Sequence, residues 1–369
     1  MKNIMKPLLA ISGLIIVCLL ISCKNRSSNS VDKTETLQSV SSFPVGVAVN
    51  PRPLKNDTLY RNVVLNEFNS LTPESQATMS TIQPKEGVFD FSECDSIVDF
   101  AIKNNKRVHG VALNWDLYGN IDWIKNFHGD SVAWENILKK HIQTVVSHYK
   151  GKVKSWGVVN EAFNDDGTLR IDDQTSTENR GSIWARKLGK DYIARAFQYA
   201  HEADPEALLF YNDFGLHLSK RQKKIDAIVN MVEEFQKRNI PIHGLGMQLH
   251  IGVSTNNDEI ESGMQKLAAT GLLVHISEVS ILVSDWKKDE SLVFTEELQK
   301  KQSDKYQFIV QAYKRSVPAD QRYGITIWGL RDPNSWVVGR FVPRDWPLLF
   351  DENYQKKKAY YGFLNGLKK

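Results

Sequence analysis

Polar side chains able to move protons stand at the ends of short apolar runs in this chain. Glu161 follows the run KVKSWGVVN, and Glu278 lies in the run LLVHISEV. Amide and imidazole groups occupy comparable places, namely Asn160, Asn212, Gln248 and His250. Either glutamate alone is compatible with an exposed or ion-paired carboxylate. The two glutamates together with these amide and imidazole side chains indicate acid–base chemistry at one site.

A pair of carboxyl groups can cleave a glycosidic bond when the two hold opposite charge states. One is protonated near neutral pH and donates to the leaving oxygen, while the other is ionised and attacks the anomeric carbon. Retention of configuration needs the carboxyls about 5 to 5.5 Å apart, and their mutual repulsion separates their pKa values. We expect His250 to hydrogen-bond Glu278, and Asn160 to hold the 2-hydroxyl of a sugar.

Three tryptophans add flat apolar faces that match the C–H faces of sugars: Trp115, Trp328 and Trp336. Aromatic walls with a few polar groups are typical of carbohydrate clefts. A tryptophan at position 115 or 336, taken alone, is equally compatible with core packing. Trp328 is the strongest platform candidate because it ends an apolar run.

Eight apolar or β-branched runs recur along the chain: PVGVAV, VVLNEFNSL, RVHGVAL, KVKSWGVV, ALLFYND, IHGLGMQL, LLVHISEV and YGITIWGL. Nearly continuous apolar character is typical of buried parallel strands. Helical patterns separate them, such as residues 225–235 behind a Ser219 cap and residues 260–267 closed by Gly271. The alternation predicts an α/β fold, a (β/α)8 TIM barrel forming a single catalytic domain, with its active site at the C-terminal strand ends.

The segments WGVVNEAF, GMQLH, ISEVS and ITIWGLRDPNSW occur in this order. Together they resemble glycoside hydrolase family 10, the retaining endo-β-1,4-xylanases. The likeness runs from about Phe43 to the C-terminus and includes TPES, GVALNW, YNDF and PLLFDENY. The resemblance implies a (β/α)8 barrel with Glu161 as general acid/base and Glu278 as nucleophile. It also implies substrate contacts from Asn160, Gln248, His250, Trp115, Trp328 and Trp336, and we add Glu74 and Asn212 to this set.

The chain departs from the family pattern at several polar positions. In TPESQATM, Glu74 is kept, while the family's asparagine, lysine and tryptophan are replaced by Ser75, Thr78 and Met79. Three further positions lose a histidine or an aspartate: Val111, Gly157 and Ser280. The reacting centre is retained and the lining of the subsites on the non-reducing side becomes smaller or apolar. We therefore expect those subsites to accept a decorated or different β-linked sugar.

The first residues have the pattern of a secretory signal. Lys2 and Lys6 precede an apolar run that ends in Leu20-Ile21-Ser22-Cys23, which resembles a bacterial lipobox. We expect residues 1–22 to be a signal peptide and Cys23 to be lipidated, with a plain signal peptide or an anchor helix as the alternatives. Lys24 favours the outer membrane, on the periplasmic or the cell-surface side. Residues 23–42, rich in Ser, Asn and Thr, would form a flexible tether to a domain spanning residues 43–369.

Composition restricts the partners. The formal net charge is +4, of which two lysines lie in the predicted signal peptide, so nucleic acid is not expected as a partner. No Cys/His ligand spacing is present, and we expect no metal and no cofactor. The expected partners are a polysaccharide and, through the lipid alone, a membrane; the domain should be a monomer.

Three functions remain open. The first is retaining hydrolysis of xylan or a xylan-like hemicellulose, and the second is the same chemistry on a different or decorated polysaccharide. The third is a surface glycan-binding barrel that has lost activity, against which the retention of both glutamates argues.

Overall fold

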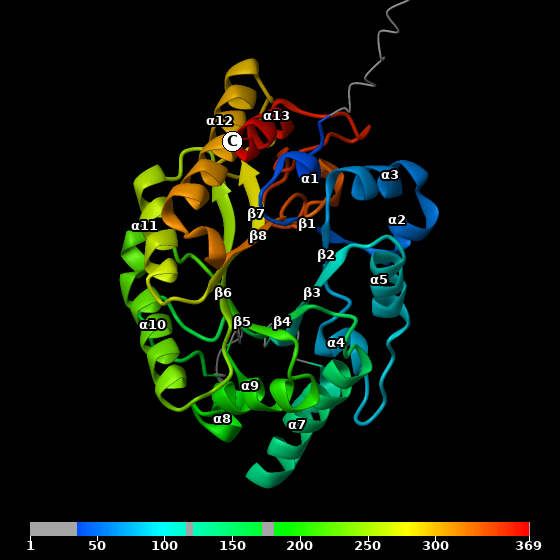
Figure 1. Ribbon diagram of the computed structural model, residues 1–369, viewed down its shortest axis with the longest axis vertical. Helices are drawn as coiled ribbons and strands as arrows, with labels where there is room; N and C mark the ends of the chain where they lie inside the picture. Colours follow the sequence, from blue (N-terminus) through cyan, green and yellow to red (C-terminus); the bar gives the residue numbers. More distant parts are fainter. Residues whose placement is uncertain (1–34, 116–120, 172–180, 369) are drawn as a thin grey trace, which may run out of the picture. The chain divides into compact units, whose positions relative to one another are not determined.

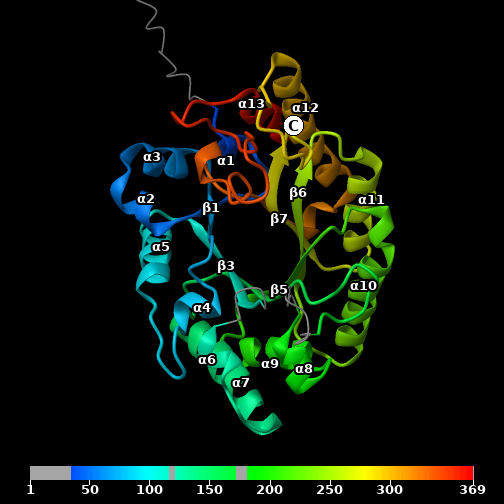
Figure 2. The ribbon, with the colours of Figure 1, turned by 180° about the vertical axis from the view of Figure 1, so that it is seen from behind.

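The structure is a computed structural model, and it describes residues 35–115, 121–171 and 181–368. Eight parallel strands close into a barrel in chain order, and helices surround the ring (Figure 1; Figure 2). The strands are β1 (Val45–Val49), β2 (Ser70–Pro73), β3 (Arg107–Asn114), β4 (Ser155–Asn160), β5 (Leu208–Phe214), β6 (Gly244–Gly252), β7 (Leu273–Leu282) and β8 (Arg322–Ile327). The predicted (β/α)8 barrel is confirmed.

Helices lie on the outside of the barrel (Figure 1); the first precedes β1, the last follows β8, and others connect successive strands. Those before β5 are α1 (Leu37–Val40), α2 (Pro51–Asn56), α3 (Thr58–Glu67), α4 (Met79–Ile82), α5 (Ser92–Lys103), α6 (Asp122–Lys125), α7 (Ser131–His148), α8 (Ile183–Leu188) and α9 (Tyr192–Ala203). After β5 come η1 (Ser219–Arg221), α10 (Gln222–Lys237), α11 (Asn257–Ala268), α12 (Glu296–Ser316), η2 (Ala319–Gln321), η3 (Asp332–Asn334) and α13 (Lys358–Leu367). Among the described residues, no helix is long and apolar enough to cross a membrane.

The strands are buried on both faces, which explains their continuous apolar sequences. Residues of β1 that point into the barrel and residues that point toward the helices are alike inaccessible to solvent. Parallel strands covered by helices have no face that needs polar side chains. Polar residues are therefore conspicuous where they do occur: one group lies at the C-terminal mouth, and another, which includes His109, Ser155, His275 and Thr326, is buried away from the cleft.

Two local predictions are wrong. The run VVLNEFNSL is not one strand, because its first part lies in α3 and only its last residues enter β2. The side chains of Tyr60 and Val64 are buried one helical turn apart, so the apolar residues have helical spacing. Ser219 does not cap α10: it lies in η1, and its backbone N–H and hydroxyl donate to Glu259. The helix at residues 257–268 is as expected, capped by Asn256 and followed by Gly271 in a left-handed conformation.

The folded unit begins before the predicted boundary. Leu37 is fully buried and its backbone N–H donates to Glu67 Oε2 at 3.0 Å, so α1 packs on the barrel. Residues 35–42 therefore belong to the catalytic domain and not to the tether, because an apolar side chain in this short helix completes the core. The predicted signal peptide, Cys23 and the rest of the tether lie outside the described residues.

Candidate active site

A cleft of about 750 Å³ opens at the C-terminal ends of the strands. Nine of the ten residues predicted for catalysis or substrate binding line it: Glu74, Trp115, Asn160, Glu161, Gln248, His250, Glu278, Trp328 and Trp336. Asn212 is the exception. It is 1% exposed and lies beneath the cleft, where it joins Asn160 to Glu278. It is therefore placed to position the reacting groups and not to contact a sugar.

Both oxygens of the Glu278 carboxylate have partners. Asn212 Nδ2 donates to Oε1 at 2.8 Å, and His250 Nε2 lies 3.1 Å from Oε2. The second imidazole nitrogen, His250 Nδ1, is 2.7 Å from Ser280 Oγ, so the serine that replaces an aspartate still orients the ring. The predicted contact between His250 and Glu278 is present. This arrangement fixes the carboxylate plane toward the cleft.

An irregularity in β7 turns Glu278 into the cleft. The pairing of β6 with β7 runs from Met247 opposite Ile276 to Gln248 opposite Glu278, which leaves Ser277 as an extra residue. Such bulges re-aim side chains and are common beside active sites. The Ser277 hydroxyl donates to Asn212 Oδ1 at 2.6 Å, so the extra residue also orients the amide that binds Glu278. Glu278 consequently lies inside β7, and not at its end as predicted.

Glu161 follows β4 in a left-handed conformation, with φ of 56°. Non-glycine residues seldom adopt this geometry, and it occurs most often at functional sites. The Glu161 N–H donates to Asn212 O at 2.9 Å. Its carboxylate Oε1 accepts from Gln248 Nε2 at 3.1 Å and from Asn160 Nδ2 at 3.2 Å. The predicted polar residues thus form one network around both glutamates.

Arg170 holds Glu161 from the other side and was not found by sequence reasoning. Its Nη1 donates to the Glu161 carbonyl oxygen at 3.0 Å and to Oε2 at 3.3 Å. The loop that follows Glu161 folds back toward it, because the Arg170 N–H donates to Ala162 O at 2.8 Å. An arginine in a surface loop has no sequence signal that would place it here.

Burial raises the pKa of Glu161, and the charges of Asp213 and Glu278 raise it further. The hydrogen bond from Gln248 and the positive charge of Arg170 act in the opposite direction. The net result is a carboxyl that holds its proton to higher pH than an exposed glutamate does. A general acid requires this property.

A buried ion pair lies behind Glu161. Lys224 Nζ is 2.6 Å from Asp213 Oδ1, and both side chains are fully buried. Tyr211 donates its hydroxyl to Asp213 Oδ2 at 2.6 Å. Lys224 was not identified from the sequence, because a lysine-rich helix start is ordinarily solvated. Neither residue of the pair lines the cleft, so Asp213 influences Glu161 through its charge alone.

Three of the departures from the family pattern line the cleft, namely Ser75, Thr78 and Val111. Val111 and Gly157 are partners in the register of β3 and β4, and a β-carbon at Gly157 would lie 3.2 Å from Val111 Cγ2. Ser75 and Thr78 line the same cleft, and the Thr78 hydroxyl donates to the Ser75 carbonyl oxygen at 2.7 Å. The side chains that line the cleft here are therefore those of a valine, a serine and a threonine whose hydroxyl group bonds to the serine backbone. Burial raises the pKa of the neighbouring Glu74 carboxyl.

The tryptophans contribute apolar surface as expected. Trp328 packs with Ala48, Val111 and Ala112, and is 8% exposed. The Trp336 ring centroid is 4.9 Å from that of His250. Sequence reasoning missed several other residues that line the cleft, among them Phe214, His217, Arg221, Trp286, Arg340 and Phe341. Within residues 35–115, 121–171 and 181–368, no group of three or more His, Cys, Asp or Glu side chains could hold a metal ion.

Comparison with known proteins gives concordant matches. The profile of Glycosyl hydrolase family 10 matches residues 35–366. The chain is 37% identical to endo-beta-1,4-xylanase Xyn10C of Cellvibrio japonicus, covering 92% of this chain and 58% of that protein. It is 35% identical to an endo-1,4-beta-xylanase of Geobacillus stearothermophilus, covering 88% and 95%.

A solved structure of a Cellvibrio japonicus xylanase10C mutant in complex with xylopentaose superposes with a TM-score of 0.82. It is 36% identical and covers 91% of this chain and 69% of that one. The barrel, the position of the paired glutamates and these matches agree, and the chain belongs to glycosyl hydrolase family 10.

Proposed function

We propose that this protein hydrolyses β-1,4-linked xylan or a xylan-like hemicellulose with retention of configuration. The observation that carries the proposal is the network joining Glu161 and Glu278 through Asn160, Asn212 and Gln248 at the floor of one cleft. The names of the relatives, which are xylanases, support this substrate class. The chemistry needs only side chains of this chain.

In the first step Glu278 attacks the anomeric carbon while the bond to the leaving sugar breaks. Glu161 donates its proton to the leaving oxygen, so that the departing sugar leaves as a neutral alcohol. Asn212 and His250 hold the attacking carboxylate, which prevents rotation away from the carbon. A covalent glycosyl-enzyme results.

In the second step a water molecule replaces the leaving sugar. Glu161, now ionised, takes a proton from the water, whose oxygen attacks the anomeric carbon and releases Glu278. The same carboxyl must therefore be protonated in one step and ionised in the next. The opposing influences on its pKa, burial on one side and Arg170 on the other, suit both demands.

Substrate preference tests the proposal most directly. We expect hydrolysis of at least one member of a panel of xylan, arabinoxylan and β-glucan. Decorated xylan should be cleaved faster than bare xylo-oligosaccharides, because the side chains of Ser75, Thr78 and Val111 are small and leave room in the cleft for a substituent. Reducing-sugar release and product chromatography give the rates and separate internal from terminal cleavage. Equal rates on bare and decorated substrates would refute this interpretation of the three side chains. Retardation in a polysaccharide gel without hydrolysis would favour a binding protein instead.

Arg170 should influence the pH profile of the reaction. Removing its charge in Arg170→Gln should raise the pKa of Glu161, so the decline of kcat/KM at high pH should move to higher pH. Arg170→Lys retains a cation and is the matched control. Both variants lose the Nη1 group that donates to the Glu161 carbonyl oxygen and to its carboxylate, so both should show a lower kcat. A pH profile of Arg170→Gln that coincides with that of Arg170→Lys would contradict the electrostatic role.

We further propose that the protein is an outer-membrane lipoprotein carried on Cys23 and a tether of residues 24–34. The support is the sequence Leu20-Ile21-Ser22-Cys23 and the polar composition that follows it. Cys23→Ser should move the enzyme from the membrane fraction to the soluble fraction. Unchanged fractionation of that variant would reject lipid anchoring.

A further inference from the structure

An exposed tryptophan stands at the edge of the cleft where β7 ends. Trp286 is 39% exposed and lines the cleft, whereas most large aromatic side chains of the domain are buried. Single exposed apolar side chains are common and need no explanation. This one differs in the backbone that presents it.

Two consecutive residues of this turn have left-handed backbone conformations. Asp285 has φ of 52° and Trp286 has φ of 68°. For a bulky residue this geometry is an outlier, and it persists only where the surroundings impose it. The strained conformation therefore indicates that the backbone of this turn is held by other contacts.

Those contacts come from two carboxylates. The buried Asp345 accepts the Val283 N–H at 3.0 Å on one oxygen and the Ser284 N–H at 2.9 Å on the other. Asp285 Oδ1 accepts the Ser254 N–H at 2.9 Å, which ties the turn to the loop after β6. A β-carbon on Gly252 would collide with Asp285 Oδ1, so the glycine is needed at this point. The turn is thus fixed to two neighbouring loops before any ligand binds.

The tryptophan faces an extended site. In the closed barrel, β7 lies across the mouth from β3, so Trp286 and Val111, which both line the cleft, come from opposite sides of the ring. Phe341, 40% exposed, follows β8 and also lines the cleft, with its ring 5.2 Å from Trp336. A chain bound across both glutamates would reach this aromatic edge.

We propose that Trp286 is a stacking platform for a pyranose ring of the polysaccharide at a distal position on the leaving-group side of the cleft. This inference rests on the proposed function and adds a binding position to it. A rigid indole offers a large apolar face at little entropic cost, because its backbone is already held. The ligand class is a β-linked sugar chain long enough to span from the glutamates to Trp286. Shorter oligosaccharides would leave the platform empty.

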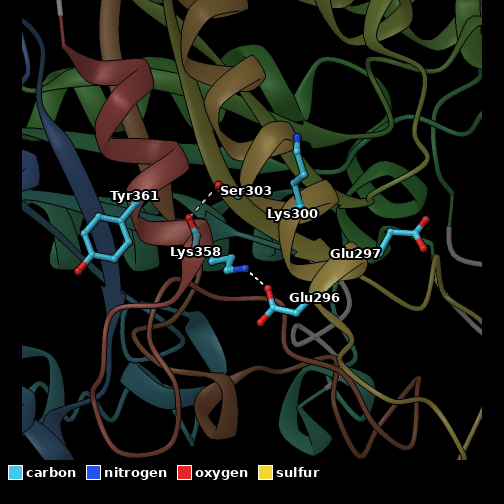
Figure 3. A pocket seen from close by; sticks show the side chains of 6 residues that line it. All are labelled: Glu296, Glu297, Lys300, Ser303, Lys358 and Tyr361. Carbon is cyan, nitrogen blue, oxygen red and sulfur yellow. Dashed lines mark hydrogen bonds and ion pairs between the residues drawn. The ribbon is translucent and has the colours of Figure 1, made fainter.

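The surface offers a matched aromatic control. A second hollow, of about 480 Å³, lies between α12 and α13 on the outer ring of helices (Figure 3). Tyr361 borders it and is 52% exposed. The hollow is crossed by an ion pair between Lys358 and Glu296, and by a hydrogen bond from Ser303 Oγ to Lys358 O at 2.8 Å. All of its lining residues come from α12 and α13, and none comes from the end of a strand.

The test compares long and short oligosaccharides. For Trp286→Ala, the ratio of kcat/KM on xylohexaose to that on xylotriose should fall about five- to tenfold relative to wild type. Trp286→Phe, which keeps an aromatic face, should recover most of the ratio, and Tyr361→Ala should keep the wild-type ratio. Melting temperatures identify any variant that fails to fold. If Trp286→Ala fails to fold, the ratio of kcat/KM values is compared between Trp286→Phe and the wild type instead.

Binding separates this proposal from the proposed function. Calorimetric titration of xylohexaose into Glu278→Gln protein, with and without Trp286→Ala, needs no turnover and should show the same five- to tenfold loss of affinity. If the wild-type enzyme cleaved none of these oligosaccharides, but its affinity for xylohexaose depended on Trp286, the proposed hydrolysis would be refuted and the stacking role of Trp286 would be supported. An unchanged ratio in Trp286→Ala, or an equal loss in Trp286→Phe, would overturn the platform.

Discussion

Glu278→Gln should reduce kcat by about 10⁴- to 10⁶-fold while leaving the barrel folded. The amide has no ionised oxygen to attack the anomeric carbon, so the covalent intermediate cannot form. Its carbonyl oxygen can still accept the hydrogen bond from Asn212 Nδ2, and its NH₂ group faces His250 Nε2, which can act as acceptor in the other tautomer. Few native contacts are lost, which is why stability should change little.

Initial rates on an oligosaccharide that the wild type cleaves, together with the melting temperature, check this prediction. Glu74→Gln is the matched control, because Glu74 also lines the cleft but has neither of the two catalytic roles proposed for Glu161 and Glu278. That variant should lose substrate affinity yet keep a far higher kcat than Glu278→Gln. Comparable kcat values for the two variants, or substantial hydrolysis by Glu278→Gln, would remove Glu278 from the role of nucleophile.

The sequence was informative about groups attached directly to strands. Glu161, Gln248 and Glu278 could be placed together because the C-terminal ends of parallel strands meet at one mouth, whatever the intervening helices do. The bulge at Ser277 could not be anticipated, since an extra residue in a strand leaves no trace in apolar patterning. Its consequence, the orientation of Glu278 inside β7, appears only in the structure.

Groups that act across loops were missed for a different reason. Arg170 contacts Glu161 although it lies nine positions later in the chain, in a loop. Lys224 pairs with Asp213 from the first turn of a helix whose lysine-rich sequence is typical of a solvent-exposed segment. Trp286 depends on a turn held by Asp345, which lies far along the chain. Such contacts depend on the path of the backbone between elements, and residue types at fixed spacing do not determine that path. The changed residues at Val111 and Gly157, in contrast, were identified from the resemblance to the family, and the structure adds that they are partners in the register of β3 and β4.

Glu161→Gln should affect substrates according to their leaving group. On a polysaccharide, kcat should fall about 10²- to 10⁴-fold, because no group protonates the departing oxygen. On an aryl glycoside with an acidic phenol, which departs without a proton, the first step should be nearly unaffected and only the release of the glycosyl-enzyme should be slow. A rapid initial release of phenol followed by a slow steady state would show this difference. Equal losses on both substrates would contradict the acid/base role.

The pH dependence of this variant supplies an independent check. In the wild type, burial raises the pKa of Glu161, so the acid form predominates at low pH and kcat/KM falls as pH rises through that value. Glutamine does not titrate, so the alkaline decline should disappear from the residual activity on the polysaccharide. Asn160 and Gln248 can hydrogen-bond the amide as they do the carboxyl, so the side chain should stay in place. An alkaline decline that persists unchanged in Glu161→Gln would assign the titrating proton to another group.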